Sequence, residues 1–171
     1  MQLDYLADHP EFVPVLAAWH HGEWARYYAS WPLEQVTAEL HSHTGRCQVP
    51  TTFVAVKDGR PLGSASLIIA DLEGREHLSP WLASVFVAPE RRGEGIGRRL
   101  VARVVEEATR LGFPAVYLWT PGQREYYERL GWECVETVRR PLAEVTVMRR
   151  VLTGRIEDFT AQEAGGGSFS G

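Results

Sequence analysis

The sequence predicts an α/β (α+β) domain, and two stretches carry most of that prediction. Residues 81–87 form an apolar, β-branched run that leads through a glycine-rich loop into an amphipathic helix at 96–111. Residues 51–57 and 61–70 read as strands on either side of Asp58-Gly59, a pair typical of hairpin turns. Strands and helices therefore alternate along one chain.

The remaining elements follow from apolar periodicity and turn residues. In the first third of the chain we expect a strand at 1–6, a helix from Glu11 to about Tyr28 that Gly22 kinks or breaks, and a helix that begins near Ser30 or Trp31 and ends at 41–45. In the last third we expect a strand at 115–119 and a short helix that Gly131 terminates. Two strands follow at 132–138 and 144–151, with Pro141 between them. The chain of 171 residues, 44% of them apolar, suits a single domain over 1–155. Residues 156–171, with Gly165-Gly166-Gly167-Ser168, suit a flexible tail.

Composition and charge narrow the classes of function. The formal net charge of −4 argues against general nucleic-acid binding and mildly favours a cationic substrate such as an amine. The two cysteines, Cys47 and Cys134, are far apart, and no metal-ligand spacing is present, so we expect no metal. The sequence opens without a basic-then-apolar leader and has no apolar run of membrane length. We expect a soluble, cytoplasmic protein with no membrane and no nucleic-acid partner.

The segment Arg92-Gly93-Glu94-Gly95-Ile96-Gly97 has the features of a phosphate-binding loop. Amides of the loop and of the first helical turn lack intrahelical partners and lie at the positive end of the helix dipole. Arg91, Arg92, Arg98 and Arg99 add positive charge, which indicates a diphosphate. The third glycine of the dinucleotide fingerprint and the Gly-Lys-Ser/Thr of a P-loop are both missing.

This loop resembles the Arg/Gln-x-x-Gly-x-Gly/Ala signature of the GNAT superfamily, the acetyl-CoA-dependent N-acyltransferases. Val87-Ala88-Pro89-Glu90, which precedes it, fits the same pattern. A second stretch, Arg124 to Glu133, resembles the family's aromatic-Tyr-x-x-x-Gly-aromatic helix end through Tyr126, Tyr127, Gly131 and Trp132. The two motifs stand in the family's order and separation, and the resemblance extends from about Thr51 to Trp132.

The resemblance implies a fold and a co-substrate. The fold is a central mixed, mostly antiparallel, twisted sheet flanked by helices on both faces. The co-substrate is acetyl-CoA, with no metal. The residues expected to bind it are Val85, Phe86, Val87, Arg92, Gly93, Glu94, Gly95, Ile96, Gly97, Arg98, Thr120 and Tyr126. Thr120 takes the position at which many members carry an asparagine.

The resemblance also implies direct attack of an amine on the thioester, with no covalent enzyme intermediate. Tyr127 matches the tyrosine that faces the thioester sulfur, and a hydroxyl with an ordinary pKa near 10 retains a proton for the leaving thiolate. An amide on the strand at 84–87 is expected to polarise the thioester carbonyl. The strand at 81–87 carries no carboxylate, so the general base stays open among a water chain, Glu23, Asp71 and His77.

The expected acceptor is the primary amine of a small molecule, and the candidate substrate-binding residues are Glu23, Trp24, Asp71, Trp81 and Trp119. In the family, the segment between the first two strands often forms one wall of the acceptor site. The alternative interpretation of the aromatic residues in that segment is that they pack in the hydrophobic core and do not contact the acceptor. The acidic loop that begins at Asp71 is likewise either a solvated connection or part of the acceptor side.

Two other functions stay open at this level. One is a peptide or protein N-terminal acetyltransferase, because Thr120, Gln123, Tyr126 and Tyr127 weakly resemble the pattern of one such enzyme. The other is a non-catalytic acyl-CoA-binding sensor with the same fold. The sequence specifies neither the acceptor nor the acyl chain, and it leaves open a monomer or a homodimer.

Overall fold

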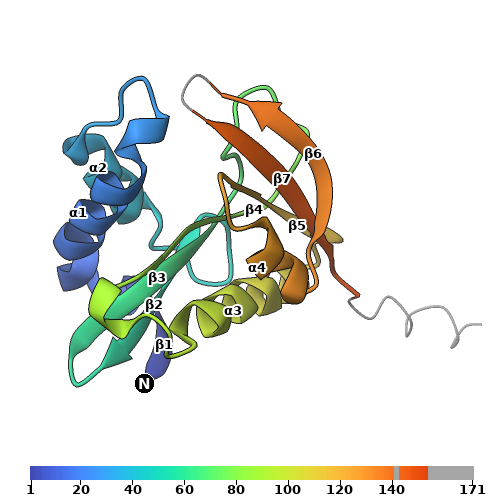
Figure 1. Cartoon of the computed structure of the whole chain (residues 1–171). Helices are drawn as coiled ribbons and strands as arrows, with labels where there is room; N and C mark the ends of the chain where they lie inside the picture. Colours follow the sequence, from blue (N-terminus) through green and yellow to red (C-terminus); the bar gives the residue numbers. More distant parts are fainter. Residues whose placement is uncertain (141–142, 154–171) are drawn as a thin grey trace, which may run out of the picture.

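The computed structural model describes residues 1–140 and 143–153 (Figure 1). The predictions for Pro141 and for the tail at 156–171 fall outside these residues. The strands are β1 (Gln2–Tyr5), β2 (Thr51–Lys57), β3 (Arg60–Ile68), β4 (Trp81–Val87), β5 (Ala115–Thr120), β6 (Glu133–Arg139) and β7 (Glu144–Val151). The helices are α1 (Val13–Trp24), α2 (Leu33–Ser42), α3 (Ile96–Arg110) and α4 (Arg124–Arg129), with short 3₁₀ helices at Leu6–Asp8, Pro10–Phe12, Ala25–Tyr27 and Pro89–Arg91.

The seven strands form one sheet in the order β1-β2-β3-β4-β5-β7-β6. β4 and β5 run parallel, and every other neighbouring pair is antiparallel. Helices α1 and α2 cover one face of the sheet and α3 covers the other (Figure 1). The mixed, mostly antiparallel sheet with helices on both faces is therefore confirmed.

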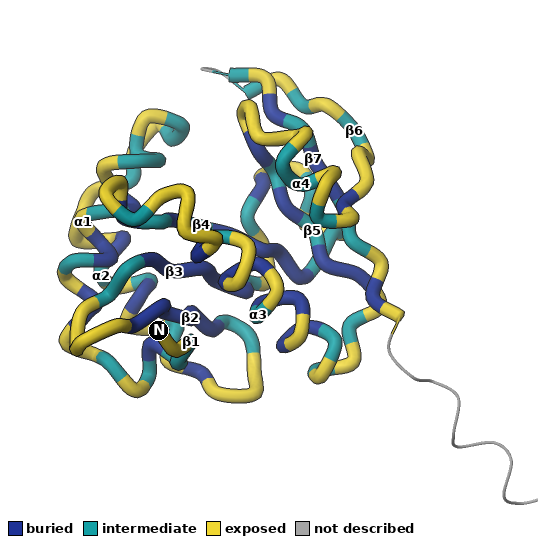
Figure 2. Tube along the Cα trace, turned by 60° about the horizontal axis from the view of Figure 1, so that its bottom comes forward, coloured by how far each residue is buried: buried dark blue, intermediate teal, exposed yellow. Residues whose placement is uncertain are grey.

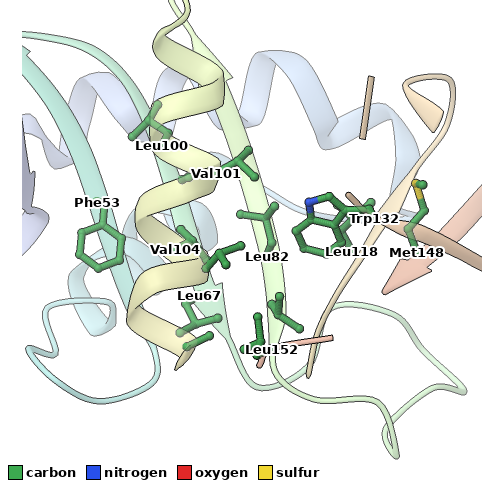
Figure 3. Packing of buried hydrophobic residues seen from close by; sticks show 14 of the residues in the cluster. Phe53, Leu67, Leu82, Leu100, Val101, Val104, Leu118, Trp132, Met148 and Leu152 are labelled. Carbon is green, nitrogen blue, oxygen red and sulfur yellow. The ribbon is translucent and has the colours of Figure 1, made fainter. Parts of the chain in front are cut away.

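Two apolar cores hold the helices to the sheet, and the central strands between them are the most buried part of the chain (Figure 2). In the larger core, Leu100, Val101 and Val104 of α3 meet side chains of the strands (Figure 3). Those strand residues include Phe53, Leu67, Leu82, Leu118 and Met148. The buried residues of α3 recur every three or four positions, which is why this segment folds as an amphipathic helix. The smaller core joins Leu16 and Leu40 to Val54 beneath α1 and α2.

The first helical region differs from the prediction. Gly22 does not break the helix, because α1 continues through it to Trp24 and only then tightens into the 3₁₀ helix Ala25–Tyr27. A glycine in a helix costs about 1 kcal/mol relative to alanine, which the burial of Leu16 and His20 in the preceding turns outweighs. Helix α2 starts later than expected, with Pro32 as its N-cap.

Candidate active site

The sheet opens between β4 and β5. Trp81 and Tyr117 form the register pair that joins these parallel strands, and the described residues contain no second pair between them. Beyond that pair the strands diverge, and the facing segments Ser84–Val87 and Leu118–Thr120 line a cavity of about 1200 Å³. The cavity therefore occupies the split in the sheet.

A bulge in β4 lies on the wall of this cavity. Ala83 pairs with Ser66 and Phe86 with Ser64, so that Ser84 and Val85 together oppose a single residue of β3. Ser84 has a φ of 52°, which is uncommon for a residue other than glycine. A bulge interrupts the hydrogen-bond ladder locally and turns main-chain groups away from it. Main-chain groups of the Ser84–Val85 segment are therefore available to a ligand in the cavity.

The glycine loop has the backbone conformation that the sequence predicts. Gly93 and Gly95 have φ values of 84° and 77°, and a Cβ on either would meet nothing within 4 Å, so the left-handed conformation and not lack of space requires glycine. Gly95 is the N-cap of α3, without a side-chain cap. The amide of Arg99 donates to the Gly95 carbonyl at 3.2 Å. The amides of Ile96, Gly97 and Arg98 precede that bond and have no intrahelical partner.

Gly97 brings bare backbone to the cavity. A Cβ at this position would lie 3.4 Å from the Tyr126 hydroxyl oxygen and 3.6 Å from Val87 Cγ2. Nearby, the Arg92 Nε donates to the Val87 carbonyl at 3.1 Å, and its guanidinium lies over the Phe86 ring. Free amides, a helix N-terminus and an arginine at one end of the cavity fit a diphosphate, as coenzyme A carries.

The other arginines near the loop differ in their surroundings. Arg91 pairs with Glu94 at 3.1 Å, which neutralises its charge locally. Arg98 lines a separate hollow of about 250 Å³ between α3 and α4, where Arg129 and Arg150 also lie. The positive charge predicted for this region is therefore divided between the loop and that hollow.

Tyr126 and Tyr127 of α4 both line the cavity. Their rings meet edge to face at 5.1 Å between centroids, and the Tyr127 ring meets buried Trp132 in the same way at 6.0 Å. Gly131, with a φ of 82°, ends the helix as predicted and lets the Trp132 amide donate to the Tyr127 carbonyl at 3.1 Å. Burial raises the pKa of the Tyr127 hydroxyl above its ordinary value, so this group keeps its proton at neutral pH.

Thr120 lies at the end of β5 and is almost completely buried. Its Oγ1 accepts a hydrogen bond from the amide of Gln123 at 3.0 Å, which fixes the turn into α4. The residue lines the cavity. Its hydroxyl still has a hydrogen to donate toward a ligand there.

The aromatic segment at the end of α1 also lines the cavity, through Trp24, Tyr27, Tyr28 and Trp31. Tyr27 meets Trp119 of β5 edge-on at 6.1 Å, a contact that joins the helical segment to the opposite arm of the sheet. Trp24 lies edge-on to Phe86 at 6.2 Å. These four side chains are therefore part of the cavity wall, whereas Trp19 packs against the smaller core.

Glu23, Asp71 and Trp119, all predicted to contact the acceptor, line the same cavity. The Trp119 indole N–H donates to the Asp71 carbonyl at 3.1 Å and so holds the start of the acidic loop against β5. Burial raises the pKa of the Asp71 carboxyl to about 7. At neutral pH this carboxyl can therefore either accept or release a proton.

Several predicted residues do not line the cavity: Arg98, which lines the separate hollow, the loop residues Gly93, Glu94 and Gly95, and also Trp81, Ile96 and His77. Trp81, which we expected to contact the acceptor, is fully buried, donates its indole N–H to the Leu78 carbonyl at 2.6 Å and does not line the cavity. It sits where β4 and β5 are still paired, on the closed side of the split. The Ile96 side chain is buried beneath α3, so only its main chain faces the loop. His77 is exposed and outside the cavity, so the structure gives it no place as the base.

Sequence reasoning missed several polar residues of the cavity, among them Glu39 and His43. They lie four positions apart at the end of α2, and the histidine-rich run there indicated only a helix terminus. The His43 ring nitrogen Nδ1 is 3.2 Å from the Thr52 hydroxyl, which in turn is 2.8 Å from the Ser66 hydroxyl. Burial lowers the pKa of His43, so the ring is neutral at pH 7.

Comparison with known proteins agrees with this geometry. A statistical model of the acetyltransferase (GNAT) family matches residues 16–132. A curated relative, an uncharacterised N-acetyltransferase of Methanocaldococcus jannaschii, is 31% identical over an alignment of length 124, and the match covers 68% of this chain and 49% of the relative. The chain therefore spans about half the length of this relative.

Solved structures share the fold. A crystal structure of an aminoglycoside 6'-N-acetyltransferase complexed with coenzyme A superposes with a TM-score of 0.72 at 18% identity, over 91% of this chain and 99% of that one. A ribosomal-protein-alanine N-acetyltransferase from Brucella melitensis gives a TM-score of 0.67 at 23% identity, over 89% and 100%. With the family match across most of the sequence, the chain belongs to the GNAT family of acetyltransferases.

Proposed function

We propose that this protein transfers an acetyl group from acetyl-CoA to the primary amine of a small molecule. The observation that carries the proposal is the cavity itself, which runs from the N-terminus of α3, past the β4 bulge, to a wall of acidic and aromatic residues. An anion site and a cation site at two ends of one cavity suit a coenzyme A thioester and an amine.

One half of the cavity, which we assign to acetyl-CoA and call the donor half, is formed mainly by backbone groups. The amides of Gly93 to Arg98 and the Arg92 side chain are the groups that we assign to the diphosphate. Acetyl-CoA supplies the acetyl group as a thioester. Amides of the Ser84–Val85 bulge are the donors that we assign to its carbonyl oxygen, because they lie on the cavity wall and outside the regular ladder.

Proton transfer falls to side chains that line the cavity. In the proposed reaction the amine nitrogen bonds to the acetyl carbon, the carbon–sulfur bond breaks, and the Tyr127 hydroxyl gives its proton to the departing thiolate. The amine proton passes to Asp71 or Glu23, directly or through water. No covalent intermediate is proposed.

The other half of the cavity, which we assign to the amine and call the acceptor half, favours an enzyme with a small acceptor. It argues against both a peptide or protein N-terminal acetyltransferase and a non-catalytic sensor. Tyr27 contacts Trp119, and the Arg140 guanidinium lies 5.1 Å from the centre of the Tyr28 ring, so two contacts bridge the helical segment and the far arm of the sheet. Such a bridge narrows the path that an extended peptide needs. A sensor of acyl-CoA needs only the donor half. The acidic and aromatic side chains on the opposite wall would have no role in such a protein.

The test is release of coenzyme A, followed with a thiol reagent, across amino acids, polyamines, aminoglycosides and short peptides. Tyr127→Phe should lower kcat by about a hundredfold to ten-thousandfold, since it removes a general acid, while the Kd for acetyl-CoA stays within about threefold. Tyr117→Phe, a half-buried tyrosine of β5 outside the cavity, is the matched control.

Three results would count against the proposal. Unchanged turnover in Tyr127→Phe removes the acid role. Acetyl-CoA that binds without turnover of any amine favours the sensor. Absence of acetyl-CoA binding removes the donor site altogether.

A further inference from the structure

Asp71 and Glu39 lie at the end of the cavity opposite the glycine loop. Asp71 follows β3, whose last residue Ile68 pairs with Trp81 at the start of β4, whereas the loop follows the other end of β4. Glu39 comes from α2, and the Trp31 indole N–H donates to both of its carboxylate oxygens at 3.1 Å. Both carboxylates line the cavity, so this end of it is acidic.

Acidic side chains outnumber basic ones along the cavity. The described residues that line it include two arginines, Arg26 and Arg92, against five carboxylates: Glu23, Glu39, Asp71, Glu73 and Glu76. Arg92 belongs to the donor half, where it bonds to the Val87 carbonyl. The acceptor half therefore has an excess of negative charge, which favours a cationic ligand.

A cation already lies against this wall. The Arg140 guanidinium is 5.1 Å from the centre of the Tyr28 ring and 5.0 Å from that of Trp119, distances at which aromatic rings attract positive charge. Its charge acts on Asp71 by lowering the pKa of that carboxyl, whereas Glu39 raises it. With Arg26 and Arg140 counted together, the acceptor half holds two arginines against five carboxylates, so negative charge remains there without a counter-charge.

The reacting amine does not supply that counter-charge. A nitrogen that attacks a thioester must be neutral, so it brings no positive charge to the wall during the reaction. An aliphatic ammonium elsewhere in the same molecule keeps its charge at neutral pH, because its pKa is about 10, as in lysine. The two requirements are met together by a molecule with two amines.

We infer that the acceptor carries a second ammonium group, as α,ω-diamines and longer polyamines do, and that this group lies between the carboxylates of Glu39 and Asp71. The other amine then reaches the β4 bulge. This inference rests on the proposed function and names its substrate class.

The test compares α,ω-diaminoalkanes of three to eight carbons with monoaminoalkanes of the same length, by coenzyme A release. The wild-type kcat/KM should favour the best diamine roughly tenfold to a hundredfold. In Glu39→Gln that ratio should fall toward one. This substitution removes the charge, and its amide oxygen still accepts from Trp31. Glu34→Gln, an exposed change at the start of the same helix, should keep the wild-type ratio.

The outcomes separate this inference from the proposed function. If wild type acetylates both amines with equal kcat/KM, the second-ammonium site is wrong and the acetyltransferase stands. If neither amine turns over, the proposed reaction fails, and binding decides the site: tryptophan fluorescence titrations in the presence of coenzyme A should then show tighter diamine binding that Glu39→Gln weakens. Equal binding of the two amines overturns the inference.

Discussion

A side chain at Gly63 of β3 would clash with the carbonyl of Phe86 on β4. A Cβ at Gly63 would lie 2.4 Å from that carbonyl oxygen and 3.2 Å from Val87 Cα, both of them backbone atoms. The close approach stands directly beside the β4 bulge, because Gly63 pairs with Val87 and Ser64 with Phe86. The missing side chain therefore helps to hold β4 in the shape that the cavity requires.

Gly63→Ala should for that reason destabilise the fold by about 1–3 kcal/mol, since backbone atoms cannot rotate away from the new methyl group. Urea unfolding followed by fluorescence measures the change. Gly22→Ala is the control: Gly22 is exposed within α1 with nothing within 4 Å of its built Cβ, so this change should stabilise by up to about 1 kcal/mol. Equal stability of Gly63→Ala and wild type would show that β4 moves freely beside the bulge.

Gly97→Ala should weaken acetyl-CoA binding without unfolding the protein. The added methyl group would stand 3.4 Å from the Tyr126 hydroxyl, close but not clashing, and would cover backbone at the N-terminus of α3. We expect the Kd for acetyl-CoA to rise about tenfold, which corresponds to about 1.4 kcal/mol. Calorimetric titration measures it. S-acetylpantetheine lacks the diphosphate, so its Kd should change little, and an equal loss for both ligands would place the diphosphate elsewhere.

The backbone of the proposed donor half could be predicted from the sequence because its conformation is set locally. Gly93, Gly95 and Gly97 precede or open one helix, and Tyr126 and Tyr127 stand in another. Backbone conformation and helix ends are set by neighbours in the chain, so short motifs describe them well. The burial of Trp81 was missed because a strand pattern does not tell which end of β4 lies beyond the split.

Contacts between distant segments could not be predicted in this way. Helical periodicity places Glu107 on the polar face of α3, yet it is fully buried, with the Tyr5 hydroxyl donating to it at 3.0 Å and Arg103 at 3.1 Å. Tyr5 comes from β1, 102 residues earlier in the sequence. Glu39 was missed for the same reason, since its place in the cavity depends on how α2 packs over the sheet.

Buried His20 should make the fold sensitive to acid. Its Nε2 is 2.8 Å from the Ser64 hydroxyl, and burial lowers its pKa to about 3, with the nearby His43 acting in the same direction. Below the ordinary histidine pKa of about 6.5 the unfolded chain binds a proton that folded His20 does not, so stability falls as pH drops through that window.

Urea unfolding between about pH 7.5 and 5 tests this in His20→Gln. The variant loses packing and is expected to be the less stable protein at pH 7.5, but its stability should decline less on acidification, so that the difference from wild type narrows. His41→Gln, an exposed change on α2, should follow the wild-type curve. If the stability of wild type and of His20→Gln falls in parallel as the pH is lowered, another group controls the loss of stability in acid.

Asp71 should act on stability with the opposite sign. Burial raises the pKa of its carboxyl to about 7, opposed by Trp119 and Arg140 and reinforced by Glu39. The unfolded carboxyl titrates near pH 3.9, so between about pH 4 and 7 the folded protein binds the extra proton, and stability decreases as pH rises through that window. Asp71→Asn removes this penalty, and we expect it to exceed wild type in stability by about 1–2 kcal/mol at pH 8 and by little at pH 4.5.

A diamine should narrow the difference in stability between the two proteins, because an ionised Asp71 beside an ammonium is no longer an uncompensated buried charge. At about pH 8, with coenzyme A present, an α,ω-diaminoalkane should raise the Tm of wild type more than that of Asp71→Asn, since ligand binding to the folded state stabilises it by mass action. The diamine should lose much of this effect at about pH 6, where Asp71 is protonated. An equal rise in the Tm of both proteins at both pH values would show that the carboxylate does not meet the acceptor.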